Sequence, residues 1–320
     1  EIRLSLVGSE MCIRDSRGMA LFDLTRIFGY PYLKDNGASL GVPIVKELST
    51  IDSKPARNTV AECYTEIISD LKNSTELLSG DFNKGKVNRW AAMTLLSRVY
   101  LYKGEYNEAL TMAENAIKGA EKEGYALWTN EEYPTAWGND ASASNPGEIL
   151  FEIVNLTTDS PGKESMGYLN SYNGYDDMCI TCSFYQLLKK DPKDVRLKIL
   201  SFDKKYYAYV NKYQPQQGEN ITDANIPLIR LSEAYLNAAE AAVQTGDNAK
   251  AVKYLNSIVQ RANPENSVEG KTLTLENVLD ERRKELVAEG HRMYDVIRNG
   301  MTVKRIDVKD SDINKTKHNT

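Results

Sequence analysis

Apolar residues recur at helical spacing in several separate segments of the chain, with polar residues between them. In the segment 60–78, four apolar side chains fall on a single helical stripe: Val60, Tyr64, Ile67 and Leu71. Thr59 precedes this stripe as an N-cap residue. A shorter helix is predicted over 19–28, where the Gly-Tyr-Pro sequence at 29–31 ends it. Helix is therefore the main element expected in the first part of the chain.

Two longer segments, 87–120 and 226–263, share one pattern of small residues. When their glycines are superposed, four positions correspond: Ala92 with Ala234, Leu96 with Ala238, Gly104 with Gly246, and Ala109 with Ala251. Small residues let two antiparallel helices approach closely, and a glycine in the left-handed conformation ends the first helix. Such helix pairs are the units of tetratricopeptide-like arrays, which bury their apolar faces by stacking. The pattern predicts a mostly α-helical fold built from these hairpins.

A third helix is expected over 279–300, where charged residues are concentrated. Glu281, Glu285 and Glu289 follow one another at intervals of four, which would place three carboxylates on one helix face. One interpretation is a general acid and base for glycoside hydrolysis. The other is a set of structural ion pairs, because like charges one turn apart repel each other and need cations nearby.

The spacing of the arginines favours ion pairs. Arg282 lies three residues before Glu285, and Arg292 lies three residues from both Glu289 and Asp295. We expect another helix to supply a further partner, either Arg230 or Arg298. Charges balanced in this way suppress pKa perturbation rather than exploit it. The predicted structural ion-pair lattice contains nine residues: Arg230, Glu233, Glu281, Arg282, Glu285, Glu289, Arg292, Asp295 and Arg298.

The middle of the chain, 124–221, is rich in Pro, Gly, Asn, Ser and aromatic residues. A short strand is predicted over 148–154 and a short helix over 184–188. Long irregular segments inside a compact fold are usually functional or disordered, and disordered segments avoid Trp and Tyr. We therefore interpret 124–221 as a functional region carried by the helical scaffold.

Six aromatic residues of this region are candidates for ligand binding: Trp128, Tyr133, Trp137, Tyr168, Tyr172 and Tyr175. The C–H faces of sugar rings pack on the electron-rich faces of such side chains. Neighbouring polar residues could orient the sugar hydroxyls: Asn139, Asp140, Asn170, Asn173, Asp176 and Asp177. The alternative is that the rings only anchor loops to the scaffold, and composition does not choose between the two.

Composition argues against several classes of function. A net charge of −5 without a basic stripe disfavours nucleic acid as a partner. Four cysteines and two histidines offer little for a metal, and the Cys179–Cys182 pair has no second pair at ligand spacing. No phosphate loop, nucleophile elbow or zinc-protease motif is present. We expect no cofactor, no metal and no catalytic residues, and no apolar run of about 18 residues predicts a membrane helix.

Five motifs lie at separated positions along the chain. Residues 17–31 contain R-x-x-x-x-F-x-L and G-x-P, residues 57–64 contain R-x-x-V-x-E-x-Y, and residues 96–109 contain L-x-R-x-Y-L-Y-x-G-x-Y-x-x-A. Residues 230–236 read R-x-x-E-x-Y-L, and residues 281–298 read E-R-x-x-E-L-x-x-E-G-x-R-x-x-D-x-x-R. Together these motifs resemble those of the SusD/RagB family. The last string is the most specific, because so many charged positions rarely coincide by chance.

The resemblance implies a SusD-like α-α superhelix with a loop-rich insertion and a non-enzymatic role. Such a surface-exposed lipoprotein would capture a glycan or oligosaccharide and pass it to a SusC-like TonB-dependent transporter in the outer membrane. Family members normally begin with a signal peptide and a lipidated cysteine, and they extend beyond the last position of this chain. We therefore expect a fragment whose N-terminal lipid anchor lies outside it. The ligand, a glycan or a peptide, stays open.

These observations divide the chain into five segments. Residues 1–16 resemble a translated sequencing adaptor and are expected to be foreign. The others are an N-terminal helical part with the first hairpin, the irregular ligand side, the second hairpin with the charged helix, and a polar truncated tail: 17–123, 124–221, 222–300 and 301–320. Two other functions stay open. A tetratricopeptide-type adaptor for peptides or proteins would need more evenly spaced hairpins, and a surface glycosidase is disfavoured by the charge pattern.

Overall fold

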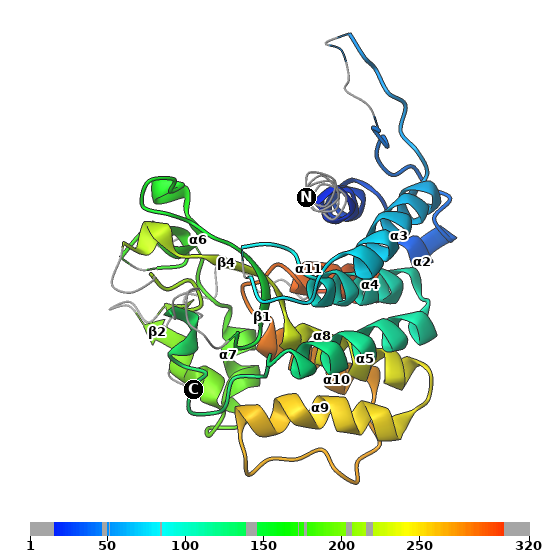
Figure 1. Ribbon diagram of the computed structural model, residues 1–320. Helices are drawn as coiled ribbons and strands as arrows, with labels where there is room; N and C mark the ends of the chain where they lie inside the picture. The colour runs from blue at the N-terminus through cyan, green and yellow to red at the C-terminus, as the bar shows by residue number, and fades with distance from the viewer. Residues whose placement is uncertain are drawn as a thin grey trace.

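The computed structural model describes residues 16–46, 50, 52–83, 85–138, 146–171, 173–175, 178–202, 207–215 and 220–303. Helices dominate this part of the chain, as predicted. They lie as antiparallel layers on one side of the molecule, and the irregular middle of the chain lies on the other side (Figure 1).

The N-terminal helices form where the apolar stripe predicts them. A helix occupies residues 16–28, and α2 (Tyr32–Asp35) follows the turn after it. Helix α3 (Val60–Leu77) begins at Thr59, whose hydroxyl accepts a hydrogen bond from the Glu62 amide. The Glu62 carboxylate in turn accepts one from the Thr59 amide. This reciprocal cap satisfies two amides that the first turn of a helix otherwise leaves without partners.

Both predicted hairpins are present. The first joins α4 (Arg89–Lys103) to α5 (Tyr106–Lys122), and the second joins α8 (Leu231–Gln244) to α9 (Asn248–Ala262). The glycine after the first helix of each hairpin lies in the left-handed region, with φ of 84° at Gly104 and 80° at Gly246. The small and apolar side chains that correspond between the hairpins are all buried at 0% exposure, which permits close helix packing: Ala92, Leu96, Ala109, Ala234, Ala238 and Ala251.

The second hairpin stacks directly on the first, so that α3, α4, α5, α8 and α9 form successive layers (Figure 1). Buried polar contacts also join the hairpins. Arg98 on α4 donates from Nε and Nη2 to the two carboxylate oxygens of Glu233 on α8, both at 2.5 Å. Asn237 on α8 donates to the Ser97 hydroxyl at 2.8 Å. These contacts fix the register between helices that are far apart in sequence.

Short elements make up the region between α5 and α8. Strand β1 (Ile149–Ile153) pairs antiparallel with β4 (Ile226–Arg230), and β2 (Leu200–Phe202) pairs antiparallel with β3 (Ala208–Val210). The other elements are short helices and helical turns: η1 (Ala136–Gly138), η2 (Gly162–Glu164), α6 (Met166–Leu169), α7 (Cys182–Lys189), η3 (Val195–Ile199) and η5 (Ile221–Asp223). The strand and the helix predicted in this region are confirmed. Strand β4 was not expected, because its apolar residues continue directly into those of α8 and the whole stretch was predicted as helix.

The charged segment near the C-terminus is not the single helix that was expected. Helix α10 (Leu275–Glu285) ends at Glu285, and α11 (Arg292–Arg298) begins after a turn. In that turn Ala288 and Gly290 have φ of 65° and 77°, which takes the backbone off the helical path. Glu289 therefore lies in the turn and not on the helix face that carries Glu281.

Buried apolar side chains form two main clusters. The larger lies between the stacked hairpins and includes Leu96, Ala113 and Leu255. The smaller lies in the irregular region and includes Trp137 and Phe184. No helix among the described residues is both long enough and apolar enough to cross a bilayer.

Replacing Gly246 with alanine is expected to lower the free energy of unfolding by about 1–2 kcal/mol. A Cβ added at Gly246 meets no atom within 4 Å, so left-handed backbone strain is the whole cost. Asparagine tolerates this conformation better, and Gly246→Asn should recover part of the loss. Urea unfolding of both variants measures the difference, and a Gly246→Ala variant as stable as wild type would contradict the strain argument.

Candidate functional site

A network of buried, ionised side chains lies where β4, α9 and α10 meet the irregular region. This buried charge network contains five cations and five carboxylates: Arg196, Lys212, Arg230, Arg261, Lys284, Glu148, Asp194, Glu281, Glu285 and Glu289. All of these side chains except Lys284 are exposed by 6% or less. The equal numbers of positive and negative groups matter, because an unpaired charge at this depth would be very costly.

Glu285 lies at the centre of this network. Its Oε2 atom is 2.6 Å from Arg261 Nη2 and 3.3 Å from Arg196 Nη1, and its Oε1 atom is 3.2 Å from Arg230 Nη1. These arginines come from three separate elements: α9, η3 and β4. Burial raises the pKa of Glu285, but the three guanidinium groups outweigh burial and hold the pKa well below its ordinary value.

The other two glutamates of the charged segment are bound in the same way. Glu289 accepts hydrogen bonds from Arg230 Nε and Nη2, both at 2.8 Å, and from Lys212 Nζ at 2.5 Å. Glu281 Oε1 lies 2.6 Å from Arg196 Nη2. Burial raises the pKa of Glu281 and of Glu289, and the neighbouring cations lower each pKa below its ordinary value overall. All three carboxylates are therefore ionised at neutral pH.

The charges of this network favour a structural role over acid–base chemistry. A general acid in a glycosidase carries a proton near neutral pH, which requires a raised carboxyl pKa. The pKa of each of the three glutamates is lowered instead, and Glu285 has no exposed side-chain surface that a sugar could reach. Lys212 is the group shifted toward neutrality, because burial lowers its pKa to about 8 despite the neighbouring Glu289.

A second group of buried ion pairs connects α8 with α10 and α11. Arg298 pairs with Glu240 on α8 and, at 2.6 Å, with Asp295. Arg282 lies 3.5 Å from Glu240 and 3.4 Å from Asp295, and it donates to Asn237 Oδ1 at 2.7 Å. Together with Arg98–Glu233, these contacts bind the C-terminal helices to the stacked hairpins.

Eight of the nine predicted lattice residues lie in buried ion pairs: Arg230, Glu233, Glu281, Arg282, Glu285, Glu289, Asp295 and Arg298. Two expected contacts are wrong. Arg282 is directed toward α8 and forms no pair with Glu285, and Arg292 forms no ion pair within the described part of the chain. The turn at Ala288 separates Arg292 from the position that a continuous helix would have given it.

Six members of the network were not identified from the sequence: Glu148, Asp194, Arg196, Lys212, Arg261 and Lys284. Glu148, Lys212 and Arg261 have few charged neighbours in sequence, while Asp194 and Arg196 stand in a stretch of mixed charge, so no local pattern marks them as partners of the glutamates. One signal could have indicated them. Three glutamates in the segment 281–289 need more cations than their own segment brings to them, and the missing cations had to come from elsewhere in the fold.

Three of the predicted ligand-binding rings cover the charge network: Trp128, Tyr133 and Trp137. They are 8%, 0% and 4% exposed, and they pack edge to face with ring centroids 4.9–6.3 Å apart. The Trp137 ring lies 4.9 Å from the Arg230 guanidinium and 4.8 Å from Lys212 Nζ, and the Tyr133 ring lies 4.3 Å from the Arg261 guanidinium. Cations therefore occupy the ring faces on which a sugar would stack. This corrects the expectation that these three rings form a ligand platform.

Two other predicted aromatics form a pair at the surface. Tyr168 on α6 and Tyr175 have ring centroids 5.1 Å apart and an interplanar angle of 83°. Tyr175 is 46% exposed and Tyr168 is half-buried. The Tyr175 amide donates to the Tyr168 carbonyl at 3.2 Å, which holds the two rings together. Ligand contact by this pair stays a prediction.

The polar residues near the Tyr168–Tyr175 pair differ in whether their side chains are exposed to a ligand. Asn173 is exposed, whereas Asn170 is buried and donates its side-chain amide to the Met166 carbonyl at 2.9 Å. Five other predicted residues lie outside the described residues: Tyr172, Asn139, Asp140, Asp176 and Asp177. Among the described residues, no group of three or more Asp, Glu, His or Cys side chains is placed to hold a metal ion.

Two family models match the chain. The model described as the SusD family matches residues 128–320, which is more than half of the chain. A second model, described as "Starch-binding associating with outer membrane", matches residues 16–101.

Individual relatives are similar over different lengths. A SusD-like protein of Bacteroides ovatus is 24% identical over 322 residues, which cover 88% of this chain and 57% of that protein. The starch-binding protein SusD of Bacteroides thetaiotaomicron is 36% identical over 97 residues, or 30% of this chain and 17% of that protein. The chain thus spans less than two thirds of the length of either relative.

A solved structure is similar over nearly the whole chain. The crystal structure of a Bacteroides vulgatus protein described as sugar-binding has 98% sequence identity and a TM-score of 0.93. The match covers 97% of this chain and 69% of that one.

Proposed function

Because the chain belongs to the SusD family, we propose that it is a non-enzymatic subunit that binds glycans or oligosaccharides. Its similarity to a starch-binding protein and to a protein described as sugar-binding supports carbohydrate as the ligand class. The buried charge network supports a role without catalysis, because its central carboxylate, Glu285, is paired with three arginines and has no exposed surface that a sugar could reach.

The observation that carries the proposed binding site is the Tyr168–Tyr175 pair, in which Tyr175 is exposed. Two rings at 83° form a corner, so one sugar ring can pack its C–H face on Tyr175 while its edge contacts Tyr168. The exposed Asn173 adds an amide that can bond to sugar hydroxyls. A few polar groups beside an aromatic surface are the usual means by which a site orients its ligand.

The partner in this proposal is a SusC-like TonB-dependent transporter at the outer membrane, and the protein is a surface lipoprotein there. The family description that names association with the outer membrane supports this location. The helical hairpins are the rigid part available for docking, while the irregular region carries the ligand site. The tetratricopeptide-type adaptor has less support, because only two such hairpins stack in the described part of the chain.

We expect Tyr168→Ala and Tyr175→Ala each to weaken carbohydrate binding by about two- to tenfold, because one aromatic contact contributes about 0.5–1.5 kcal/mol. The double variant should lose most of the binding. Native affinity gels that contain starch or another neutral polysaccharide measure the effect as restored mobility. The melting temperature of Tyr175→Ala should change little, since Tyr175 is exposed.

The matched control is Tyr30→Ala, because Tyr30 is 57% exposed and lies on the helical side. The polysaccharide gel should retain the Tyr30→Ala variant as strongly as it retains the wild type. Retention of the Tyr168/Tyr175 double variant at wild-type strength would move the carbohydrate site elsewhere. Release of sugar from any retained polysaccharide by the purified protein would contradict the non-enzymatic role.

A further inference from the structure

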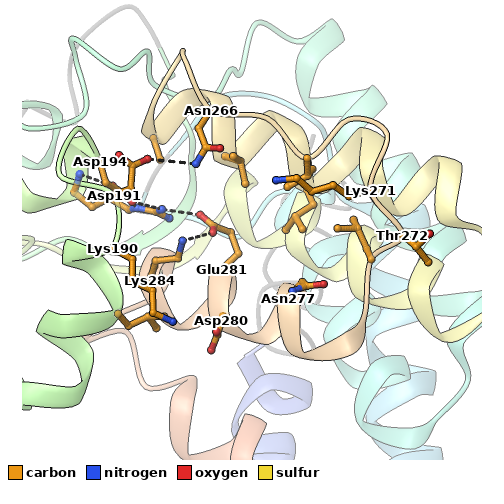
Figure 2. Close-up of a pocket in the computed structure, with 17 residues that line it drawn as sticks. Lys190, Asp191, Asp194, Asn266, Lys271, Thr272, Asn277, Asp280, Glu281 and Lys284 are labelled. Atoms are coloured by element: carbon orange, nitrogen blue, oxygen red, sulfur yellow. Dashed lines mark hydrogen bonds and ion pairs between the residues drawn. The ribbon is translucent and has the colours of Figure 1, made fainter.

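A separate pocket lies between α7, α9, α10 and the loop 263–274 (Figure 2). Its volume is about 350 Å³, and none of its lining residues belongs to the Tyr168–Tyr175 pair. Small-molecule sites in proteins begin at about 300 Å³. The pocket is therefore large enough for a monosaccharide or a disaccharide.

The floor of this pocket is apolar. Leu255 and Val259 of α9 and Leu273 of the loop line it, and all three are buried. A ligand with a C–H face could pack on this floor, and its polar groups would then meet the charged walls.

The carboxylates of the inner wall are already bound by protein groups. Asp194 and Glu281 each lie 2.6 Å from Arg196 Nη2. Asp191 Oδ2 accepts hydrogen bonds from the side-chain amides of Asn263 at 2.9 Å and of Asn266 at 3.3 Å. Arg196 and Lys284 therefore compensate the charges of Asp194 and Glu281, whereas the two neutral amides orient Asp191 and leave its charge in place.

The lysines that line the pocket have fewer protein partners than its inner-wall carboxylates. Lys190 and Lys271 are exposed, and neither forms an ion pair among the described residues. Lys284 lies 2.5 Å from Glu281 and keeps further N–H groups for a ligand. Figure 2 shows Lys271 extending from the loop toward the side of the pocket where Glu281 and Lys284 lie. Lys190, Lys271 and Lys284 thus all line the same pocket.

The loop that carries Lys271 is held in place from α9. Asn248 donates its side-chain amide to the Lys271 carbonyl at 3.0 Å and accepts a hydrogen bond from the Leu273 amide at 2.8 Å. Asn256 accepts hydrogen bonds from the Val268 amide at 2.9 Å and from the Ser267 hydroxyl at 3.1 Å. A loop fixed in this way reduces the ordering cost of binding at Lys271.

Two carboxylates of the pocket, Asp191 and Asp280, have no ion-pair partner among the described residues, and they limit the kind of anion that fits. Asp280 lies on α10 at the rim beside Asn277 and Lys284 (Figure 2). It repels a second negative charge, and it can accept hydrogen bonds from hydroxyl groups. The pocket thus favours a singly charged ligand rich in hydroxyls over an inorganic dianion.

We propose that this pocket binds a small polyhydroxy carboxylate of the hexuronate class, independently of the Tyr168–Tyr175 site. The ligand carboxylate lies between Lys271 and Lys284, its ring covers Leu255 and Val259, and its hydroxyls bond to Asp280. The same chemistry is present in a free hexuronate and in an acidic residue of a polysaccharide chain.

Isothermal titration of the whole chain with galacturonate, at low ionic strength, tests the proposal. Galacturonate should bind at least tenfold more tightly than galactose, which has the same ring with a neutral hydroxymethyl group in place of the carboxylate. Lys271→Gln should weaken galacturonate binding by about tenfold or more, because hydrogen bonds to charged groups are among the stronger ones. Lys190→Gln should weaken it as well, which provides a second variant if the first fails to fold. Oligogalacturonate that binds as well as the monomer indicates a polymer residue as the source, and exclusion of the oligomer indicates the free acid.

The matched control is Lys118→Gln, because Lys118 is exposed on α5, lies outside the pocket and forms no ion pair with any described residue. It should bind galacturonate like wild type. Tyr168→Ala should also leave galacturonate binding unchanged, which separates this site from the neutral-glycan site. Asp280→Asn should raise the affinity for inorganic phosphate relative to galacturonate. Equal binding of galactose and galacturonate, or undiminished binding by folded Lys271→Gln, would overturn the proposal.

Discussion

The Glu285→Gln variant is expected to lose about 3–5 kcal/mol of unfolding free energy, because removal of one buried partner leaves the others uncompensated. The substitution hardly changes shape, so the loss measures charge and not packing. Arg196, Arg230 and Arg261 would then share one negative charge fewer at a site without solvent. Urea unfolding measures the change, and carbohydrate affinity should stay at the wild-type value.

The pH dependence of this effect follows from the lowered pKa of Glu285. A carboxyl with a lowered folded-state pKa contributes stability that is fully present above its unfolded pKa, about 4.3, and is lost as pH falls through the folded pKa. Glutamine resembles the protonated form, so the stability gap between wild type and variant should narrow as pH falls below about 4.3.

The matched control is Glu276→Gln, because Glu276 is exposed in the first turn of the same helix. Its loss should stay below about 1 kcal/mol, the usual size of a helix-terminus charge effect. A Glu285→Gln variant with normal stability and weakened carbohydrate binding would reverse the structural assignment of this network.

The Trp137→Ala variant is expected to lose a similar amount, about 3–5 kcal/mol, for a different reason. Trp137 is 4% exposed, and its removal opens a cavity in the smaller core cluster. The change also uncovers Arg230 and Lys212, whose charged groups lie over the ring. The melting temperature of Trp137→Ala should fall strongly. Trp137→Phe should lose less stability, because an aromatic ring still faces the cations.

Ligand binding distinguishes a Trp137 that is part of the core from a Trp137 that stacks on a carbohydrate at the surface. At a temperature where Trp137→Ala is folded by circular dichroism, its retention in a neutral-polysaccharide gel should equal that of wild type. Normal melting combined with lost retention would return Trp137 to the ligand site and remove it from the core.

Local patterns were sufficient to predict the helical hairpins. The caps, the apolar stripes and the glycines at Gly104 and Gly246 act over a few residues, and the structure confirms each of them. The end of the helix at Glu285 was not predicted, because the left-handed conformation of Ala288 is not indicated by its residue type. The ion-pair role assigned to the glutamates also came from local spacing, since three carboxylates in nine residues need cations.

The cation partners of those glutamates could not be predicted from local sequence, because they depend on the three-dimensional fold. Coulomb attraction depends on distance in space, and Arg196, Arg230 and Arg261 meet Glu285 only after β4 pairs with β1 and α9 packs beside α10. The same packing turned Trp137 inward, because its ring covers cations that the chain order places far away. The linear pattern thus specified which helices form and that their acids are paired. Which ring faces meet cations and which meet solvent depended on how distant segments came together, since burial belongs to the assembled fold and to no single segment.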